Sequence, residues 1–122
     1  MKRLLITGLS GFIGWNLCQL STSEWEVYGT YFCNTLDITN VNMLSVYLTD
    51  IHTLKSLFIQ IKTEAVIHTA AQSQPNVCQN NTQESHVINV KASCDIARLC
   101  ADAKIPYIFT FTDLVFYGYN PP

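Results

Sequence analysis

The 122-residue sequence has few charged side chains, 13% of the total, and no excess of positive charge. Seven basic and nine acidic residues give a formal net charge of −2. Nucleic acids and anionic membranes attract basic patches, so neither is an expected partner. Hydrophobic residues make up 48% of the chain, which is typical of a packed globular core and excludes a disordered tail. The length fits one domain at most.

The sequence also lacks any hydrophobic run near the roughly 18 residues of a membrane span. The short apolar run at its start ends at Gly8, which is too early for a signal peptide. The five cysteines include no C-x-x-C pair, and such a scattered, odd set without an export signal indicates reduced thiols in a cytoplasmic protein. His52, His68 and His86 lie far apart and show no metal-ligand spacing, so we expect no metal site.

Short apolar runs alternate with helical patterns along the chain. The runs predict strands over residues 3–7, 26–32, 43–48, 65–69 and 107–112. Helices are expected over residues 12–20, after an N-cap at Thr49 or Asp50, and over residues 82–103, with loops at 33–42 and 72–81 and a turn at 118–122. This alternation predicts an α/β fold, a Rossmann-type doubly wound parallel sheet of order 3-2-1-4-5 that stops after the fifth strand. Residues 1–122 would form one incomplete dinucleotide-binding domain.

Apolar residues at helical spacing mark the predicted helices. The first helix carries Phe12, Ile13, Leu17 and Leu20 at this spacing. The second is expected to bury Leu54, Leu57, Phe58 and Ile61. The third is expected to bury, in part, Val87, Val90, Cys94, Ala97 and Ala101. In the fourth strand, His68 is interpreted as a structural histidine that is satisfied within the sheet.

The strongest local motif is T-G-L-S-G-F-I-G, residues 7–14, between the first strand and the first helix. Gly8 permits the tight turn off the strand, and Gly11, without a Cβ, lets a pyrophosphate lie against the backbone. Gly14 allows the helix to pack close to the sheet. The unpaired N–H groups at the helix start then face the phosphates. The motif therefore predicts a dinucleotide site.

The identity of the dinucleotide depends on the end of the second strand. An NAD site usually offers a carboxylate there, about 20 residues after the glycine loop, to hold the ribose 2′-hydroxyl. Residues 28–34 read Y-G-T-Y-F-C-N, with no acid and no arginine. Because a missing carboxylate removes a repulsion against a 2′-phosphate, we predict NADP as the cofactor, with NAD as the alternative.

Further segments accompany the glycine loop: V-I-H-T-A-A at residues 66–71, Asn89 in the long helix, and T-F-T-D-L-V-F at residues 110–116. With these motifs the chain resembles the N-terminal half of an extended short-chain dehydrogenase/reductase. More closely it resembles the dTDP-4-dehydrorhamnose reductase branch, which also contains the non-catalytic regulatory β subunit of methionine adenosyltransferase. The resemblance covers essentially the whole chain. The glycine loop and H-x-A-A are general to the superfamily, whereas T-D-x-V-F is more specific to the branch.

The resemblance implies a role for each matching residue. The residues that would hold the cofactor diphosphate are Gly8, Ser10, Gly11, Phe12, Ile13 and Gly14. Ala70 and Ala71 would let the cofactor lie across the end of the fourth strand. Asn89 would shape the floor of the active site, and Thr112 would be the catalytic hydroxyl that hydrogen-bonds the substrate carbonyl. Taken singly, these last four residues also fit ordinary structural positions; together they favour the functional interpretation.

Three positions depart from the pattern of the branch. Tyr47 stands where the branch has an aspartate that contacts the adenine amine, and Phe111 replaces a serine. Tyr117 replaces an aspartate before the glycine of the last turn. Each change exchanges a small or charged polar group for an aromatic ring, so a hydrogen bond is lost and extra volume must fit near the cleft.

Reductases of this type use a tyrosine as proton donor and a lysine four residues later. None of the six tyrosines here has a lysine at that spacing, and the substrate-binding lobe is not in this sequence. We therefore predict the cofactor-binding half of an NADP-dependent sugar-nucleotide reductase-like protein, for hydride transfer to a 4-keto-deoxysugar nucleotide, and expect no activity from this chain. The alternatives are a dinucleotide-binding regulatory protein of the β-subunit type, with a protein partner, and an inactive remnant.

Overall fold

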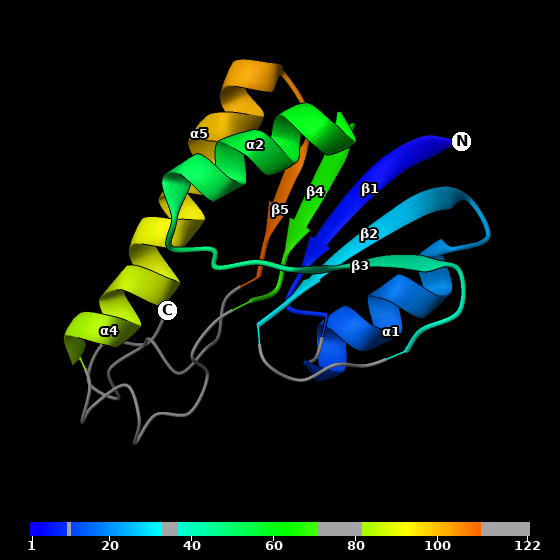
Figure 1. Cartoon of the computed structure of the whole chain (residues 1–122), viewed down its shortest axis with the longest axis horizontal. Coiled ribbons are helices and arrows are strands. Elements are labelled where there is room, and N and C mark those ends of the chain that lie inside the picture. The colour runs from blue at the N-terminus through cyan, green and yellow to red at the C-terminus, as the bar shows by residue number, and fades with distance from the viewer. Residues whose placement is uncertain (10, 33–36, 71–81, 111–122) are drawn as a thin grey trace, which may run out of the picture.

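A computed structural model describes residues 1–9, 11–32, 37–70 and 82–110 of the chain. In chain order the elements are β1 (Lys2–Thr7), α1 (Phe12–Ser21), β2 (Trp25–Tyr31), β3 (Val41–Ser45), α2 (Ile51–Ile61), β4 (Ala65–His68), α4 (Thr82–His86), the π-helical turn η1 (Val87–Lys91), α5 (Ala92–Ala103) and β5 (Tyr107–Phe109). Strands and helices alternate as the sequence predicts, except that β3 follows β2 with no described helix between them (Figure 1).

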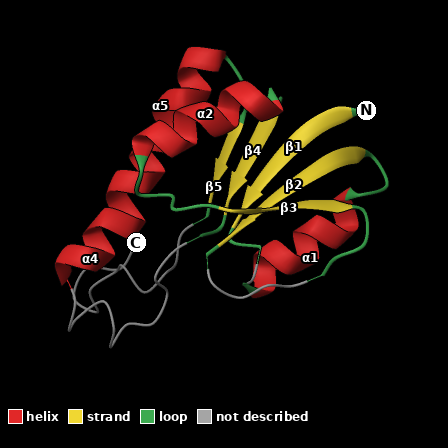
Figure 2. Cartoon of the chain, in the orientation of Figure 1, coloured by secondary structure: helices red, strands yellow, loops and turns green. Residues whose placement is uncertain are grey.

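The five strands form one parallel sheet of order β3-β2-β1-β4-β5, which confirms the predicted Rossmann-type order. Helix α1 covers one face of the sheet, and α2 and α5 cover the other (Figure 2). Because all strands run in the same direction, their carboxyl ends share one edge of the sheet. Open α/β sheets bind their ligands at this edge, so the fold determines where a site should be sought.

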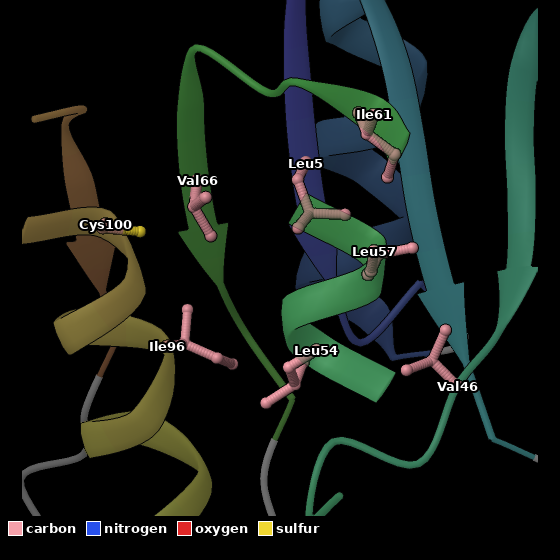
Figure 3. Close-up of a cluster of buried hydrophobic side chains, with 8 residues drawn as sticks. All are labelled: Leu5, Val46, Leu54, Leu57, Ile61, Val66, Ile96 and Cys100. Carbon is pink, nitrogen blue, oxygen red and sulfur yellow. The ribbon is translucent and has the colours of Figure 1, made fainter. Parts of the chain in front are cut away.

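A hydrophobic core fills each face of the sheet. Between the sheet and helices α2 and α5 lies a cluster of buried side chains (Figure 3): Leu5, Val46, Leu54, Leu57, Ile61, Val66, Ile96 and Cys100. On the α1 side the buried cluster consists of Leu4, Ile6, Leu9, Cys18, Val27 and Ile38. Strand β1 contributes to both clusters, since successive side chains of a strand point to opposite faces. The sheet that carries the carboxyl edge is therefore packed on both faces.

The second helix agrees closely with its prediction. Asp50 is its N-cap, and the carboxylate accepts hydrogen bonds from the N–H groups of His52 and Thr53 at 3.0 and 3.4 Å. Leu54, Leu57 and Ile61 are buried as expected, and Phe58 packs beside them. No helix among the described residues is long and apolar enough to cross a membrane.

The predicted third strand is displaced. The structure places β3 at Val41–Ser45 rather than at residues 43–48, and its first two residues belong to the segment predicted as loop. Strand β2 ends at Tyr31, whose carbonyl accepts from the N–H of Val46 at 3.1 Å. Beyond this bond no described residue that follows β2 pairs with β3, and residues 46–48 lie outside the strand. The fifth strand spans Tyr107–Phe109, and the predicted residues 111 and 112 lie outside the described part.

The burial expected of the apolar set in the third helix is wrong for most of its members, and in the first helix most of the apolar residues that mark it are exposed. Phe12 and Leu20 of α1 are 86% and 76% exposed, while Gly14 and Cys18 are buried. Helix α1 approaches the sheet through its glycine, which decides the face that packs. In the third helix the predicted set Val87, Val90, Cys94, Ala97 and Ala101 is exposed or half-buried, and the buried residues are Ala92, Asp95, Ile96 and Cys100. The π-helical turn η1 interrupts the α-helical period on which the prediction relied.

Candidate functional site

The glycine loop leaves β1 in a conformation that requires glycine at its first position. Gly8 has φ +78°, in the left-handed region that other residues rarely adopt. A Cβ there would lie 2.7 Å from both Ala70 N and Thr69 Oγ1. The next side chain, Leu9, is fully buried in the core on the α1 side, and its N–H donates to Thr30 O at 2.8 Å. The loop is therefore packed against the ends of both β2 and β4.

The other two glycines of the loop have different environments. A Cβ on Gly14 would lie 2.1 Å from Gly8 O, so only glycine allows α1 to come this close to the loop. A Cβ on Gly11 would meet only Gly8 O, at 3.4 Å, so the protein itself has room there. The tasks predicted for the three glycines, a turn, an open approach and close packing, match these geometries.

Helix α1 begins at the loop with backbone donors that have no hydrogen-bond partner among the described residues. Gly11 is its N-cap and provides no side-chain hydrogen bond to the first turn. No described residue accepts a hydrogen bond from the N–H of Phe12 or Ile13. The first amides of a helix carry partial positive charge and bind anions. This end of α1 can therefore hold a phosphate group.

The loop opens into a cleft of about 890 Å³ at the carboxyl edge of the sheet. The walls come from the ends of the first four strands, from the start of α1, and from α4 and η1. Its described lining contains one acidic residue, Glu84, and no lysine, arginine or histidine. The lining residues are Gly8, Gly11, Phe12, Ile13, Gly14, Thr30, Tyr31, Phe32, Val46, Tyr47, Leu48, Thr49, Thr69, Ala70, Glu84, Val87 and Ile88.

A buried polar network connects the residues after β4, which line the cleft, to helix α5. Thr7 Oγ1 lies 2.6 Å from Nδ1 of His68 and accepts from the N–H groups of Thr69 and Ala70 at 3.1 and 3.2 Å. Thr69 Oγ1 donates in turn to the carbonyl of Thr7. These bonds hold the backbone of residues 69 and 70 against the end of β1. They hold Ala70 at the cleft wall.

The network also determines the protonation of His68. Its Nε2 lies 3.0 Å from Ser93 Oγ, which donates its proton to Asn89 O at 2.7 Å. Ser93 must therefore accept from Nε2–H, and Nδ1 accepts from the hydroxyl of Thr7. His68 is 1% exposed, and burial lowers its pKa to about 4. The ring is neutral and engaged at both nitrogens, as expected of a structural histidine.

The structure brings together most of the predicted cofactor residues that it describes. Gly8, Gly11, Phe12, Ile13, Gly14 and Ala70 all line the cleft. Asn89 does not line it; this residue is half-buried in η1, and its carbonyl accepts the bond from Ser93. Ser10, Ala71 and Thr112 lie outside the described residues. Phe111 and Tyr117, two of the three aromatic replacements, lie outside them too.

Two cleft residues were not among the predicted site residues although the sequence held a signal for them. Phe32 follows β2 directly, and Tyr47 lies two residues beyond β3. Both strands were predicted as neighbours, so their carboxyl ends were expected side by side. The sequence contains no comparable signal for the contact between Ser93 and His68, which lie 25 residues apart. No group of three or more potential metal ligands occurs among the described residues.

The fold and the cleft define a Rossmann-type nucleotide-binding domain of the extended short-chain dehydrogenase/reductase type. The chain belongs to the family described as the RmlD substrate binding domain, whose model matches residues 1–121. The predicted relationship to the dTDP-4-dehydrorhamnose reductase branch is confirmed.

Curated relatives include the methionine adenosyltransferase 2 subunit beta of Xenopus laevis, 27% identical over 122 residues. They also include the probable low-salt glycan biosynthesis reductase Agl14 of Haloferax volcanii, 29% identical over 116 residues. The alignments cover 99% and 93% of this chain but only 35% and 38% of the two relatives. The chain thus spans little more than a third of the length of the curated relatives that it matches.

Solved structures agree with this placement. A hypothetical dTDP-4-dehydrorhamnose reductase from Sulfolobus tokodaii superposes with a TM-score of 0.85 at 29% identity, over 95% of this chain and 41% of that protein. The enzyme WbmH of Bordetella bronchiseptica, solved with NAD+, superposes with a TM-score of 0.82 at 22% identity, over 99% of this chain and 42% of its own. The latter likeness shows the shared fold.

Proposed function

We propose that this chain binds a nicotinamide dinucleotide in the cleft at the carboxyl edge of its sheet. NADP is the favoured cofactor and NAD the alternative. The observation that carries the proposal is the start of α1, where no described residue accepts from the N–H of Phe12 or Ile13 and where both residues line the cleft with Gly11. A pyrophosphate needs such donors and a backbone without a Cβ at the point of approach.

The residues present fit this cofactor. Gly8 and Gly14 shape the loop, and Gly11 leaves space where the diphosphate would lie. Ala70 provides a wall without a bulky side chain, so a flat ring can cross the end of β4. A bound nicotinamide supplies hydride transfer. Because no cation lines the described cleft, the phosphates would depend on backbone donors, and we expect binding in the micromolar range or weaker.

For the whole protein we propose a role in sugar-nucleotide reduction of the dTDP-4-dehydrorhamnose reductase type. The likeness to the reductases of Sulfolobus tokodaii and Haloferax volcanii supports it. In that reaction a 4-keto-deoxysugar nucleotide would accept the hydride, and Thr112 would hydrogen-bond the reacting carbonyl. The 122 residues contain no tyrosine followed by lysine four residues later. We therefore expect no turnover from this chain by itself.

The second candidate is a regulatory protein of the methionine adenosyltransferase β-subunit type. Relatives of that name from Xenopus laevis and Bos taurus are 27% and 28% identical, and the alignments cover 99% of this chain. Such a protein would bind dinucleotide without turnover and would contact a protein partner. A remnant without activity is the third interpretation, and it predicts no dinucleotide binding at all.

Calorimetric titration of the chain with NADPH, NADP+, NADH and NAD+ tests the proposed site. We expect measurable binding, which should be tighter for NADPH and NADP+ than for NADH and NAD+. Gly11→Ala should clearly lose affinity, because its methyl group would occupy the diphosphate position. Leu20→Ala is the control, since Leu20 is 76% exposed on α1 and does not line the cleft. Absence of binding to the wild-type chain would refute the proposal.

A second pair of measurements separates enzyme from regulatory protein. NADPH oxidation with a dTDP-4-keto sugar is followed in absorbance, and co-purification with a methionine adenosyltransferase catalytic subunit is measured in parallel. Stable co-purification without NADPH oxidation would favour the regulatory protein. Oxidation of NADPH by the 122-residue chain would contradict our expectation that a Tyr-x-x-x-Lys pair is required.

A further inference from the structure

We propose that Thr7 and Ser93 are positioning residues of the nucleotide site, which act through His68 and hold two parts of the cleft wall in a fixed arrangement. The two parts are Ala70, after β4, and the start of the turn η1. Thr7, His68 and Ser93 are not among the residues that line the cleft. The inference rests on the proposed function, because the effect that it predicts is measured as the affinity for the dinucleotide.

On the side of β4, the hydroxyl of Thr7 holds the backbone of the cleft wall. It donates to Nδ1 of His68 over 2.6 Å and accepts from the N–H groups of Thr69 and Ala70 at 3.1 and 3.2 Å. A hydroxyl has one proton to donate and two lone pairs. All three are used here, so the position of Ala70 is linked to the position of the imidazole ring.

On the side of α5, Ser93 continues this chain of hydrogen bonds. Its Oγ accepts from Nε2–H of His68 at 3.0 Å and donates to the carbonyl of Asn89 at 2.7 Å. Asn89 belongs to η1, whose residues Val87 and Ile88 line the cleft. Helix α5 connects through η1 to α4, which extends beyond the carboxyl ends of the strands (Figure 1). The bond to Asn89 therefore links this second part of the wall to the same imidazole ring.

The histidine between the two residues is enclosed. His68 is fully buried, and its ring centroid lies 6.3 and 6.0 Å from those of Tyr107 and Phe109 on β5. The hydroxyl of Tyr107 donates to Ser93 O at 3.2 Å, and Thr110 Oγ1 donates to His68 O at 3.0 Å. A buried ring that loses one hydrogen-bond partner cannot replace it freely with water. Removal of either partner should therefore shift the ring and disturb both parts of the wall.

Calorimetric titration of the full chain with NADPH compares Ser93→Ala with Ser93→Thr. The alanine variant loses both bonds of the hydroxyl and should bind NADPH about fivefold more weakly. Ser93→Thr keeps the hydroxyl and should bind within about twofold of the wild type. Ile96→Val is the matched control, because Ile96 is fully buried in the same helix and does not line the cleft. It should lower the stability of the chain and leave the affinity for NADPH unchanged.

A double-mutant cycle tests whether His68 connects the two positioning residues, which contact its opposite ring nitrogens. Thr7→Val keeps the shape of the side chain, removes the hydroxyl and should weaken NADPH binding about fivefold. In the double variant the total loss should be clearly smaller than the product of the two single losses, because the first change already breaks the network. Losses that multiply fully would overturn the inference. A loss in Ile96→Val as large as in Ser93→Ala would overturn it as well.

The remaining outcomes separate the inference from the function on which it rests. NADPH binding that is weakened by Gly11→Ala but not by Ser93→Ala would refute the positioning role and leave the dinucleotide site standing. If the wild-type chain does not bind NADPH, the proposed function fails and the positioning role fails with it. Nitrogen-15 NMR of the imidazole near neutral pH is an independent readout. It should show His68 protonated at Nε2, and protonation at Nδ1 in the wild type would contradict the proposed network. Circular dichroism verifies the fold of each variant before titration.

Discussion

Gly11 and Gly14 of the loop differ in how much space each has for the methyl group of an alanine. The Cβ of Gly14→Ala would lie 2.1 Å from Gly8 O, which is backbone and cannot give way easily. We expect a loss of roughly 1–3 kcal/mol in the free energy of unfolding, measured by urea denaturation. Gly11→Ala is the matched control, with its only close contact at 3.4 Å. Equal stability losses in the two variants would contradict this packing.

At the same scale, His68 makes stability depend on pH. Burial lowers its pKa from 6.5 to about 4 in the folded chain. Between these values the unfolded chain binds a proton that the folded chain does not, so stability is full above pH 6.5 and falls as the pH drops toward 4. The whole step is roughly 3 kcal/mol.

Urea midpoints measured across this pH range check the dependence on His68. His68→Gln should remove most of the slope between pH 6.5 and 4. His52→Gln and His86→Gln, at exposed positions, are the controls and should preserve it. A slope unchanged by His68→Gln would show that other groups carry it.

Residue-scale prediction from sequence succeeded where geometry is dictated locally. The glycine tasks follow from their spacing between a strand and a helix, and the structure shows the turn at Gly8, the close packing at Gly14 and free space at Gly11. The partners of His68 could not be predicted, because Thr7 and Ser93 are brought to it by β1 and by the helix after β4. Contacts of this range require the register of the sheet and the rotation of the helix.

At the scale of elements, Asp50 is expected to stabilise helix α2 through its cap. Its carboxylate accepts from Thr53 Oγ1 at 2.8 Å as well as from two backbone N–H groups, and these bonds hold the pKa of Asp50 below its usual value. Asp50→Ala should lower the thermal midpoint, because the first turn loses its acceptor. Asp50→Ser should retain most of it, and Asp102→Ala, at an exposed position in α5, should change little.

Helix faces were less predictable than helix positions. The long helix was expected over residues 82–103 and is found there, but its packing face differs. The N–H of Ala92 bonds to Val87 O, five residues back, so the π-helical turn shifts the residues beyond it. Asp95 then faces inward, and its carboxylate pairs with Lys91 Nζ at 2.8 Å. A hydrophobic pattern cannot reveal a buried carboxylate that a neighbouring lysine neutralises.

At the scale of the whole molecule, β5 presents apolar surface at one side of the sheet. It pairs with β4, and no described strand pairs with its other edge. Ile108 and Phe109 are 56% and 49% exposed. Exposed strand edges and apolar patches promote association. We expect concentration-dependent self-association in sedimentation velocity, which Ile108→Lys should reduce; Ile59→Lys, on α2, is the control. A wild-type chain that stays monomeric at high concentration would contradict this expectation.

The whole-molecule prediction was the most successful, for a physical reason. Alternating strands and helices leave few topologies with short connections, so the order of the sheet follows from the pattern. The contents of the cleft follow less directly. Ala70 could be placed from its position after β4, whereas the sequence indicated that β2 and β3 end side by side but not at which residues they end, so Phe32 and Tyr47 were not assigned to the cleft.

The burial of Leu9 has a consequence for the kinetics of ligand capture. Its side chain is locked in the core between β1 and α1, and a Cβ on Gly29 would come within 3.1 Å of it, so this part of the loop is tightly wedged. The described part of the loop, at Gly8 and Leu9, is therefore held in its shape by the folded core. Because little binding free energy is then spent on ordering this part of the site, a ligand should associate in a single fast phase.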